Sequence, residues 1–580
     1  MAARTVAELL VSELADAGVR RIYGIVGDSL NPVSDALRRD GRIDFVQMRH
    51  EESGAFAASA EAQLTGKLAC CAGTAGPGNL HLINGLYDAW RSYAPVFAIA
   101  SHIPSSQIGM SYFQETHPER VFEECSVYCE LASTAEQMPR IIQTGIQKAI
   151  SEQGVSTIAI PGDVGDHPYR QTGLRHPPFE RPAEKSPAPE ALETLAEAVN
   201  AAKSVTFFCG DGCRHAHGQV VELARKLKAP IAYTLRGKQW MGADNPFDVG
   251  MTGLIGYGGA TNAMKNCDLL IMFGCDFPYA PWIPQTPKIA QVDIRGSHLG
   301  RRARVDIGIE ADVGKTAEAL MALVAEKTDS RHLDAALKET QKSRKDLNAY
   351  IESVSCQQLP HPEYATHLID RFAADDAIFT IPTGLGTVWG ARYITPKSGR
   401  RIIGSFSHGS MACELPMAIG AQMAYPERQV VAICGDGGFA MLMGEILTIA
   451  QYALPVKMFV YNNATLGFID LEMMAAGYLP YKTKLKNPNF ADMAKSLGIE
   501  GIRIDDNCGL EAGIRRAFET DGPVLVDMAT DPHAIALPPK ISISQAANFS
   551  LALSKLALSG SITTAAGIIK SNDKTLKTLL

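Results

Sequence analysis

The chain has 580 residues, enough for three or four domains, and its hydrophobic fraction of 46% is typical of a globular protein. A formal net charge of -7 gives no electrostatic basis for binding nucleic acid. Its 12 cysteines include no C-x-x-C pair, so we expect reduced core thiols rather than a zinc site or a disulfide framework.

Residues 1–180 alternate helical and strand-like stretches and form the first predicted unit. A charged amphipathic helix over residues 5–17 argues against a signal peptide, and strands are expected over 21–26, 68–72 and 96–100. Glu51 begins an alanine-rich helical run, where a carboxylate is favourable near the helix N-terminus. Since no apolar run reaches the roughly 18 to 20 residues needed to cross a bilayer, we expect a cytoplasmic protein.

Prolines and charges over residues 173–189 predict an exposed connector to a second α/β unit, which spans 190–345. Strands are expected over 204–209, 230–234, 269–273 and 288–293, and a charged helix over 330–354 ends the unit. Polar or glycine-containing turns follow the strands, at 210–212, 236–238, 252–255, 274–279 and 293–294. None of them has the G-x-G-x-x-G pattern, so a nicotinamide site of the usual kind is not supported.

The third unit, residues 360–535, carries the most informative pattern. A strand over 429–434 leads into Gly435-Asp436-Gly437-Gly438, and another over 455–461 leads into Asn462-Asn463. Strands of a parallel sheet end at one edge, where α/β folds bind ligands. Glycines let the backbone approach a phosphate, and Asp436 and Asn463 offer the oxygen ligands that Mg²⁺ prefers. The pattern predicts a metal-diphosphate site.

Interleaved strands and helices throughout predict an α/β protein of three doubly wound parallel-sheet domains, in which the first and third units could be distant copies of one fold. A tail, residues 536–580, follows. Asn572-Asp573 and Gly567 interrupt its helical pattern, so a lipid-docking amphipathic helix and a plain solvated tail both remain open. The apolar face of that helix would carry Ile562, Ala566, Ile569, Leu576 and Leu580, with Lys570, Lys574 and Lys577 beside it.

Glu51, the run 409–411 and the spaced Asp436 and Asn463 pair together resemble the thiamine-diphosphate enzymes, in the branch of acetohydroxyacid synthases and pyruvate oxidases. Within that branch the chain is most similar to the bacterial pyruvate dehydrogenases (quinone), also called pyruvate oxidases. The stretches that carry this likeness are 73–87, 112–118, 235–238, 248–256 and 404–411. The resemblance implies a pyrimidine-binding, an FAD-binding and a diphosphate-binding domain, in that order.

The resemblance also implies thiamine diphosphate and Mg²⁺ as cofactors, and it gives roles to particular residues. Glu51 would hydrogen-bond N1' of the aminopyrimidine and so promote formation of the ylid. The carbonyl of Gly409 would accept the 4'-amino hydrogen bond, and Met411 would force the cofactor into a V shape. Asp436, Asn463 and the carbonyl of Thr465 would bind the metal. The cofactor-binding set is Glu51, Gly409, Ser410, Met411, Asp436, Gly437, Gly438 and Asn463.

FAD is the third implied cofactor, and the strand-end turns of the second unit would hold it. Without the resemblance these turns are equally well read as ordinary glycine turns. Phe113 and Phe468 would line the path between thiamine and flavin, although a phenylalanine is more often a core residue. The implied flavin-binding residues are Arg236, Thr252, Gly253, Leu254, Ile255, Cys275, Asp276, Phe277, Pro278, Tyr279 and Asp293.

The implied activity is oxidative decarboxylation of pyruvate, or a related 2-oxo acid, to acetate and CO₂ via hydroxyethyl-thiamine diphosphate, with electrons passing through FAD to a quinone. In the quinone-linked enzymes Glu51 and the diphosphate motif would meet across a subunit interface, which implies a homotetramer. The tail would dock on anionic lipid at the inner face of the cytoplasmic membrane. A phosphate- and O₂-dependent pyruvate oxidase, an acetolactate-forming carboligase and a non-catalytic oligomeric binding protein remain alternatives.

Two positions depart from the resemblance. Residues 381–386 lack the acidic residue of an Asp-x-Gly pattern, with Pro382-Thr383 in its place, which leaves substrate fit less defined than cofactor binding. Glu414 stands where a small or neutral residue is expected. If Glu414 is buried, its charge must be paired or neutralised.

Overall fold

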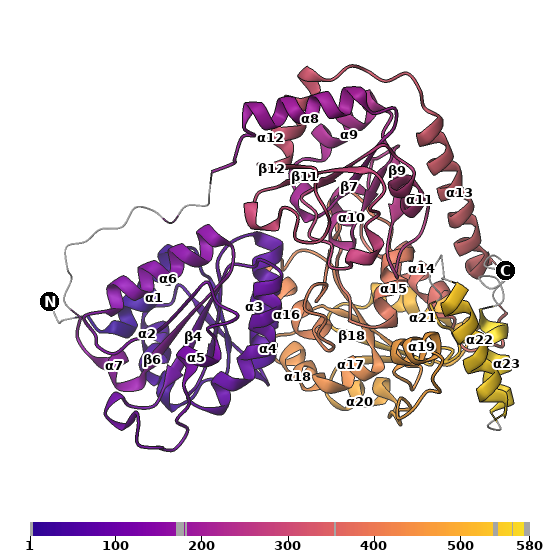
Figure 1. Cartoon of the computed structure of the whole chain (residues 1–580). Helices are drawn as coiled ribbons and strands as arrows, with labels where there is room; N and C mark the ends of the chain where they lie inside the picture. Colours follow the sequence, from indigo (N-terminus) through magenta and orange to yellow (C-terminus); the bar gives the residue numbers. More distant parts are fainter. Residues whose placement is uncertain are drawn as a thin grey trace.

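The computed structural model describes residues 4–169, 179, 183–352, 355–536, 543–558 and 561–572. Three six-stranded parallel sheets follow one another along the chain, each flanked by helices (Figure 1). This arrangement confirms the predicted fold class of three doubly wound parallel-sheet units. Among the described helices, none combines the length and the apolar character that a bilayer crossing requires.

The first unit has the strand order β2-β1-β3-β4-β6-β5. Its three predicted strands are present, and α1 begins at a capping box in which Thr5 and Glu8 satisfy each other's backbone N–H groups. The strands are β1 (Arg21–Gly24), β2 (Asp44–Gln47), β3 (Ala69–Gly73), β4 (Val96–His102), β5 (Tyr128–Leu131) and β6 (Val155–Pro161). The helices are α1 (Val6–Asp16), α2 (Asn31–Asp40), α3 (Glu51–Thr65), α4 (Pro77–Arg91), α5 (Pro118–Val121), α6 (Met138–Glu152) and α7 (Gly162–Asp166).

The second unit has the different order β12-β11-β10-β7-β8-β9, with its four predicted strands in place. Its strands are β7 (Val205–Cys209), β8 (Ile231–Tyr233), β9 (Asp248–Met251), β10 (Leu269–Phe273), β11 (Lys288–Asp293) and β12 (Ile307–Glu310). Its helices are α8 (Pro189–Ala201), α9 (His217–Leu227), α10 (Leu235–Met241), α11 (Ala260–Lys265), α12 (Val313–Leu323) and the predicted charged helix α13 (Arg331–Glu352).

The third unit has the order β14-β13-β15-β16-β18-β17, which repeats the first unit's order strand for strand. Its strands are β13 (Ile378–Thr380), β14 (Arg401–Ile403), β15 (Val430–Gly435), β16 (Lys457–Tyr461), β17 (Glu500–Ile504) and β18 (Val524–Met528). Its helices are α14 (Pro362–Phe372), α15 (Leu385–Tyr393), α16 (Glu414–Ala424), α17 (Asp436–Met441), α18 (Ile446–Gln451), α19 (Gly467–Ala475), α20 (Phe490–Ser496) and α21 (Asn507–Glu519).

Helix α3 of the first unit packs along α16 of the third, at the junction visible in the centre of Figure 1. Gly420 allows this close approach, because a Cβ at that position would overlap the carbonyl oxygen of Ala57. One buried apolar cluster contains residues of both helices, so the first and third units share part of their core.

The expectation that the cysteines form no disulfide is wrong for one pair. Cys356 and Cys508, separated by 152 residues, are bonded with their Cα atoms 4.6 Å apart. Cys356 lies in the connector before α14, and Cys508 lies in the first turn of α21, where Asn507 also hydrogen-bonds the connector at Ser355 and His361. Only tertiary folding brings Cys356 and Cys508 together, so the spacing of the cysteines in the sequence did not indicate a disulfide. The ten other cysteines are free thiols, nine of them buried, as expected.

The tail forms two helices, α22 (Ile543–Leu558) and α23 (Ile562–Ser571), that pack against α19 beside the third unit (Figure 1). The described part is therefore docked rather than a plain solvated tail. In α23 the buried side chains are Ala565 and Ile568, while the predicted lipid face, with Ile562 and Ile569, is exposed to solvent. Leu576, Leu580, Lys574 and Lys577 lie outside the described residues.

Candidate active site

A pocket that is partly open to solvent lies at the carboxyl edge of the third sheet. It lies where the turns after β13 and β15 meet, and these neighbouring strands form the switch point from which the sheet extends in both directions. Its lining includes Pro382, Thr383, Gly384, Leu385, Met411, Asp436, Gly437, Gly438, Asn463, Thr465, Leu466 and Phe468. Met411, Asp436, Gly437, Gly438, Asn463, Thr465 and Phe468 are thus brought together, as the sequence predicted.

Three helices begin at this pocket: α15 at Leu385, α17 at Asp436 and α19 at Gly467. The unpaired N–H groups and the dipoles of helix N-termini favour a negatively charged group at such a place. Gly437 also keeps the space clear, because a Cβ there would stand 2.8 Å from Cδ2 of Leu466. The pocket therefore suits an anionic group such as a diphosphate.

Asp436 is buried in the pocket wall, and its carboxylate is oriented by three donors. The N–H of Gly437 donates to Oδ1 (2.9 Å), while the N–H of Ala464 (2.7 Å) and Nδ2 of Asn487 (2.8 Å) donate to Oδ2. Burial nevertheless raises the pKa of Asp436 to about 6, because water is removed from the charged form. A divalent cation beside this carboxylate would offset that cost, so the residue fits a metal ligand.

The other two predicted metal ligands lie in the turn after β16. Oδ1 of Asn463 accepts the N–H of Thr465 at 3.1 Å, which fixes the amide near Asp436. The Thr465 hydroxyl donates to Oδ2 of Asp470 at 2.8 Å, so a contribution of Thr465 to a metal would come from its main-chain carbonyl, as predicted. Carboxylate, amide and carbonyl oxygens form a donor set suited to Mg²⁺.

Sequence reasoning missed the polar network behind Asp436. Asn487 donates from Nδ2 to both Asp436 and Oδ1 of Asn462 at 2.8 Å, and Asn462 in turn donates to the buried Asp527. Arg503 closes the network with a 2.6 Å ion pair to Asp527. Asn487 lies in a polar loop before Pro488, and nothing in its local sequence distinguishes it from an ordinary turn residue.

The run 409–411 joins the pocket to the first unit. Gly409 adopts a φ of 81°, a conformation that favours glycine. Oγ of Ser410 accepts a 2.9 Å hydrogen bond from Nδ2 of Asn84 in α4 and donates to the carbonyl of Met411. Met411 lines the pocket, with Cε 3.6 Å from where a Cβ of Gly437 would be.

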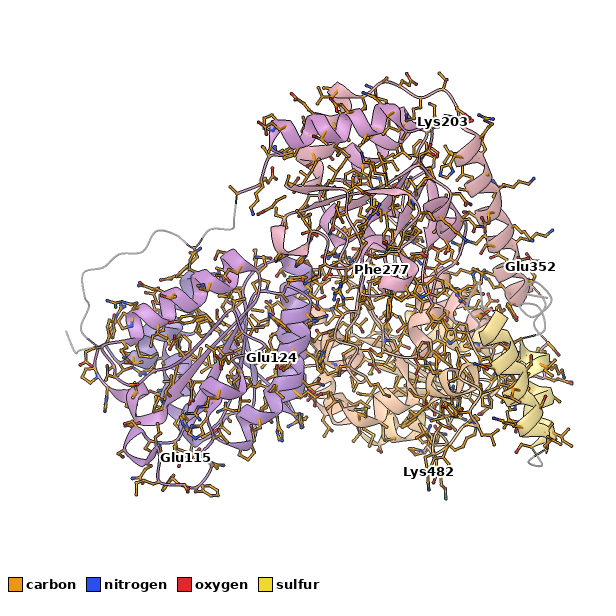
Figure 2. The ribbon with its side chains drawn as sticks, viewed as in Figure 1. Glu115, Glu124, Lys203, Phe277, Glu352 and Lys482 are labelled. Atoms are coloured by element: carbon orange, nitrogen blue, oxygen red, sulfur yellow. A yellow bond between two sulfur atoms is a disulfide. The ribbon has the colours of Figure 1, made fainter. Side chains whose placement is uncertain are left out.

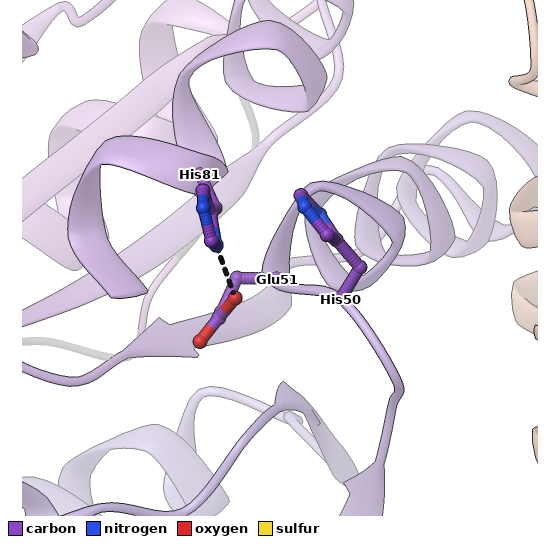
Figure 3. Close-up of side chains that lie close together, drawn as sticks. All are labelled: His50, Glu51 and His81. Atoms are coloured by element: carbon purple, nitrogen blue, oxygen red, sulfur yellow. Dashed lines mark hydrogen bonds and ion pairs between the residues drawn. The ribbon is translucent and has the colours of Figure 1, made fainter. Parts of the chain in front are cut away.

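Glu51 is the first residue of α3 and is only 6% exposed (Figure 3). Its Oε2 lies 2.9 Å from Nδ1 of His81, and the ring of His50 stacks on that of His81 with centroids 4.3 Å apart. Every described residue that lines the pocket comes from the third unit, and Glu51 is not among them, so the pocket and Glu51 are apart in a single chain. The two predicted halves of the site are separate within one copy.

Glu445, which the sequence did not single out, fixes the start of α3 against the third unit. Its Oε1 accepts the backbone N–H groups of Arg49 and His50, each at 3.0 Å. Its Oε2 accepts the Thr448 hydroxyl at 2.6 Å. The carboxylate of one unit thus holds the backbone just before Glu51 in the other.

The predicted flavin-binding residues lie at or just after the carboxyl ends of strands in the second sheet, with Asp293 as the last residue of β11. Figure 2 shows Phe277 on the side of this unit that faces the other two. Arg236 crosses to the first unit, donating to Gln63 (3.0 Å) and Ser92 (2.8 Å). Asp276 pairs with Arg301 at 2.6 Å, and Asp293 accepts the N–H of Arg295. Thr252, Cys275 and Phe277 are buried, whereas Tyr279 is exposed.

Glycines mark the switch point of the second sheet, between β7 and β10. The N–H of Gly212 donates to the carbonyl of Gly274 at 3.1 Å, so the two turns lie directly against each other. A Cβ on Gly210 would overlap that same carbonyl. A parallel-sheet switch point built of glycine turns is where α/β folds bind dinucleotides, so the turns fit the predicted flavin.

The two predicted aromatic residues are not brought together in one chain. Phe113, in a loop of the first unit, is 76% exposed and so is not a core residue, whereas Phe468 lines the pocket. Two positions depart from the family resemblance. At the first, Pro382 and Thr383 line the pocket where an acidic residue was expected. At the second, Glu414 is completely buried.

Three family models match successive parts of the chain: the thiamine pyrophosphate enzyme N-terminal TPP binding domain at 4–121, the central domain at 192–320 and the C-terminal TPP binding domain at 382–528. A putative thiamine pyrophosphate-containing protein of Bacillus subtilis, YdaP, is 35% identical over 95% of this chain and 96% of its own length. Pyruvate oxidase of Lactiplantibacillus plantarum is 31% identical over 88% of this chain and 86% of its own length. Acetolactate synthase 1 of Oryza sativa is 29% identical over 92% of this chain and 85% of its own length. The chain belongs to the thiamine pyrophosphate enzyme family.

Proposed function

We propose that the protein is a thiamine diphosphate- and FAD-dependent pyruvate dehydrogenase that uses a quinone. Pyruvate, water and quinone would give acetate, CO₂ and quinol. The observation that carries the proposal is the third-unit pocket, where three helix N-termini and the buried Asp436 converge on space suited to a metal diphosphate. The similarity to a pyruvate oxidase over most of both chains supports pyruvate as the substrate.

The predicted site residues have distinct roles in this proposal. Asp436, Asn463 and the Thr465 carbonyl would hold Mg²⁺, and the N-termini of α15, α17 and α19 would bind the diphosphate. Thiamine diphosphate, when bound, supplies the nucleophilic carbon and the electron sink for decarboxylation. Met411 would contact and support the cofactor, and the Gly409 carbonyl would accept a hydrogen bond from its amino group. Glu51 controls the proton at the aminopyrimidine ring.

We infer that a second copy of the chain supplies Glu51 to each pocket, because no described residue of the first unit lines the pocket of its own chain. Large apolar side chains that a partner would cover are exposed on both units, including Met110 and Phe113 on the first and Met441, Tyr478 and Tyr481 on the third. Pairs of this kind would assemble into the expected homotetramer.

Complementation tests the shared site. Glu51→Gln and Asp436→Ala chains would each be inactive, but a mixed dimer contains one site with both residues intact. Co-refolded equal mixtures should recover about a quarter of the wild-type activity, since half of the dimers are mixed and each has one good site of two. No recovery, with mixed dimers demonstrated by tagged chains, would place both residues in the same subunit.

The turns at the second sheet's edge would bind FAD, and Phe113 of one copy would approach Phe468 of the other on the path to the flavin. The exposed face of α23, with Ile562, Ile569 and Lys570, supports docking on anionic lipid at the inner face of the cytoplasmic membrane. Flotation with anionic vesicles, with and without pyruvate, tests this part separately; reduced protein that never floats would refute the lipid contact alone.

Anaerobic titration with pyruvate, followed through flavin absorbance, tests the reaction. Protein loaded with FAD, thiamine diphosphate and Mg²⁺ should bleach, form acetate and recover its absorbance when a soluble quinone is added. Acetolactate formed while the flavin stays oxidised would identify a carboligase instead. Acetyl phosphate and peroxide, formed with phosphate and O₂, would identify the other oxidase.

A further inference from the structure

Glu414 is a buried carboxyl group that the proposed reaction does not use. It is the first residue of α16, and its exposed fraction is 0%. In the described part of the chain, neither of its carboxyl oxygens has a hydrogen-bond partner. The Thr380 hydroxyl donates to the main-chain carbonyl of Glu414 (2.8 Å) and not to its side chain. Such a group is costly to bury in its charged form.

The carboxyl lies directly behind the turn that borders the pocket. A Cβ built on Gly438 would stand 3.1 Å from Oε1 of Glu414, so the carboxyl lies beside this glycine. Gly437 and Gly438 form the first turn of α17, and both line the pocket. Gly438 therefore borders both Glu414 and the space suited to the diphosphate.

The surroundings of Glu414 keep it neutral near pH 7. Burial raises its pKa to about 8. The titratable groups that face it are the thiols of Cys413, which precedes it, and Cys434 of β15, both with pKa values raised far by burial. Asp88 of α4 lies beyond Cys413, and burial raises its pKa too.

Resting on the proposed function, we propose that Glu414 sets the pH range of cofactor binding: the pocket binds thiamine diphosphate tightly only while Glu414 is protonated. An ionised Glu414 would repel the diphosphate past Gly438, because little water reaches this buried carboxyl to screen the two charges. By linkage, a bound diphosphate holds the proton on Glu414 to higher pH. At pH values above the pKa of Glu414 in the free protein, binding of thiamine diphosphate therefore takes up one proton.

Calorimetric titration of the apoprotein with thiamine diphosphate at constant Mg²⁺ tests this. Between about pH 7 and pH 9 the wild-type affinity should fall about tenfold more than that of Glu414→Gln, because only wild type must bind a proton. Parallel pH profiles of the two proteins would overturn the proposal. Absence of binding to both at pH 7 would instead refute the proposed function, so the two failures are distinct. Glu519→Gln, an exposed change in the same unit, should behave as wild type.

Apoprotein stability gives a second readout. Protonation favours the folded state, because the folded pKa of about 8 exceeds the ordinary value of 4.5. The ratio of the unfolding equilibrium constant of wild type to that of Glu414→Gln should therefore rise about tenfold per pH unit above pH 4.5, which means that wild type loses stability. The ratio should level off past about pH 8. A constant ratio across this range would refute a buried, titrating Glu414. Should the Gln variant not fold, Glu414→Ala serves in both measurements.

Discussion

The first and third sheets have the same strand order, and a glutamate begins the corresponding helix in each: Glu51 in α3 and Glu414 in α16. These helices follow the second strand of their units and pack on each other. The two carboxyl groups nevertheless differ in their neighbours. Glu51 contacts His81 at 2.9 Å, whereas Glu414 has no described partner. Position in the fold brings both acids to the junction, and the local neighbours then decide what each can do.

The same contrast holds at the two switch points. In the first unit, a Cβ on Gly27 would overlap the Thr74 side chain, whose hydroxyl lies 2.8 Å from that of Ser29, so side chains fill the edge. In the third unit the corresponding turn, Gly435 to Gly438, leaves the pocket open. The third unit thus carries a pocket suited to an anion, while the first unit carries Glu51, which we propose acts at that pocket from a second subunit.

Replacing Glu51 by Gln should have the largest effect on the chemistry. The amide keeps the shape but cannot exchange the proton, so the rate of pyruvate-driven flavin bleaching should fall by about 100-fold to 10,000-fold. Thiamine diphosphate binding and circular dichroism should change little. Stopped-flow absorbance measures the rate, with exposed Glu130→Gln as the matched control. Full activity of the Glu51 variant would remove this residue from the mechanism.

The sequence was enough to predict the three sheets, because alternating apolar strands and helices with turn residues between them are local signals. It also predicted the pocket residues Asp436 and Asn463, since strand ends of a parallel sheet must meet at one edge. It could not predict Asn487, Glu445 or the Cys356–Cys508 bond, because these depend on contacts between segments far apart in the chain. Glu414 was flagged as unusual, but only the structure shows it buried without a partner.

Breaking the ion pair between Asp370 and Arg400 in the third unit should cost the most stability of the variants proposed. Asp370 bonds Arg400, whose side chain is 1% exposed, whereas the first unit's Arg21, paired with Glu61, is 22% exposed. Asp370→Asn should destabilise the fold by about 3–5 kcal/mol, because it leaves a buried cation uncompensated. Glu61→Gln should cost less, since water reaches Arg21. Urea unfolding of both variants gives the two values, and equal losses would contradict the argument from burial.

Gly420→Ala should loosen the contact between the two copies of the fold. The added methyl group overlaps the Ala57 carbonyl oxygen in α3, so the helices must move apart at a cost of about 1–3 kcal/mol. Gly218→Ala in α9 is the control, because nothing lies within 4 Å of a Cβ there and alanine is the better helix former. Thermal unfolding should lower the midpoint of the first variant and leave or raise that of the second.

The smallest expected effect comes from the helices that precede the first strand of each copy. In the first unit α1 begins with the Thr5 and Glu8 capping box, whereas α14 of the third unit begins at Pro362 with no side-chain hydrogen bond from its N-cap residue. Thr5→Ala should lower the free energy of unfolding by about 1 kcal/mol, because one backbone N–H of α1 loses its hydrogen-bond partner. Thr5→Ser retains the hydroxyl and should recover most of that loss in urea unfolding. If the two variants unfold alike, the hydroxyl of Thr5 does not stabilise α1, and α1 gains no more from its N-cap side chain than α14 does.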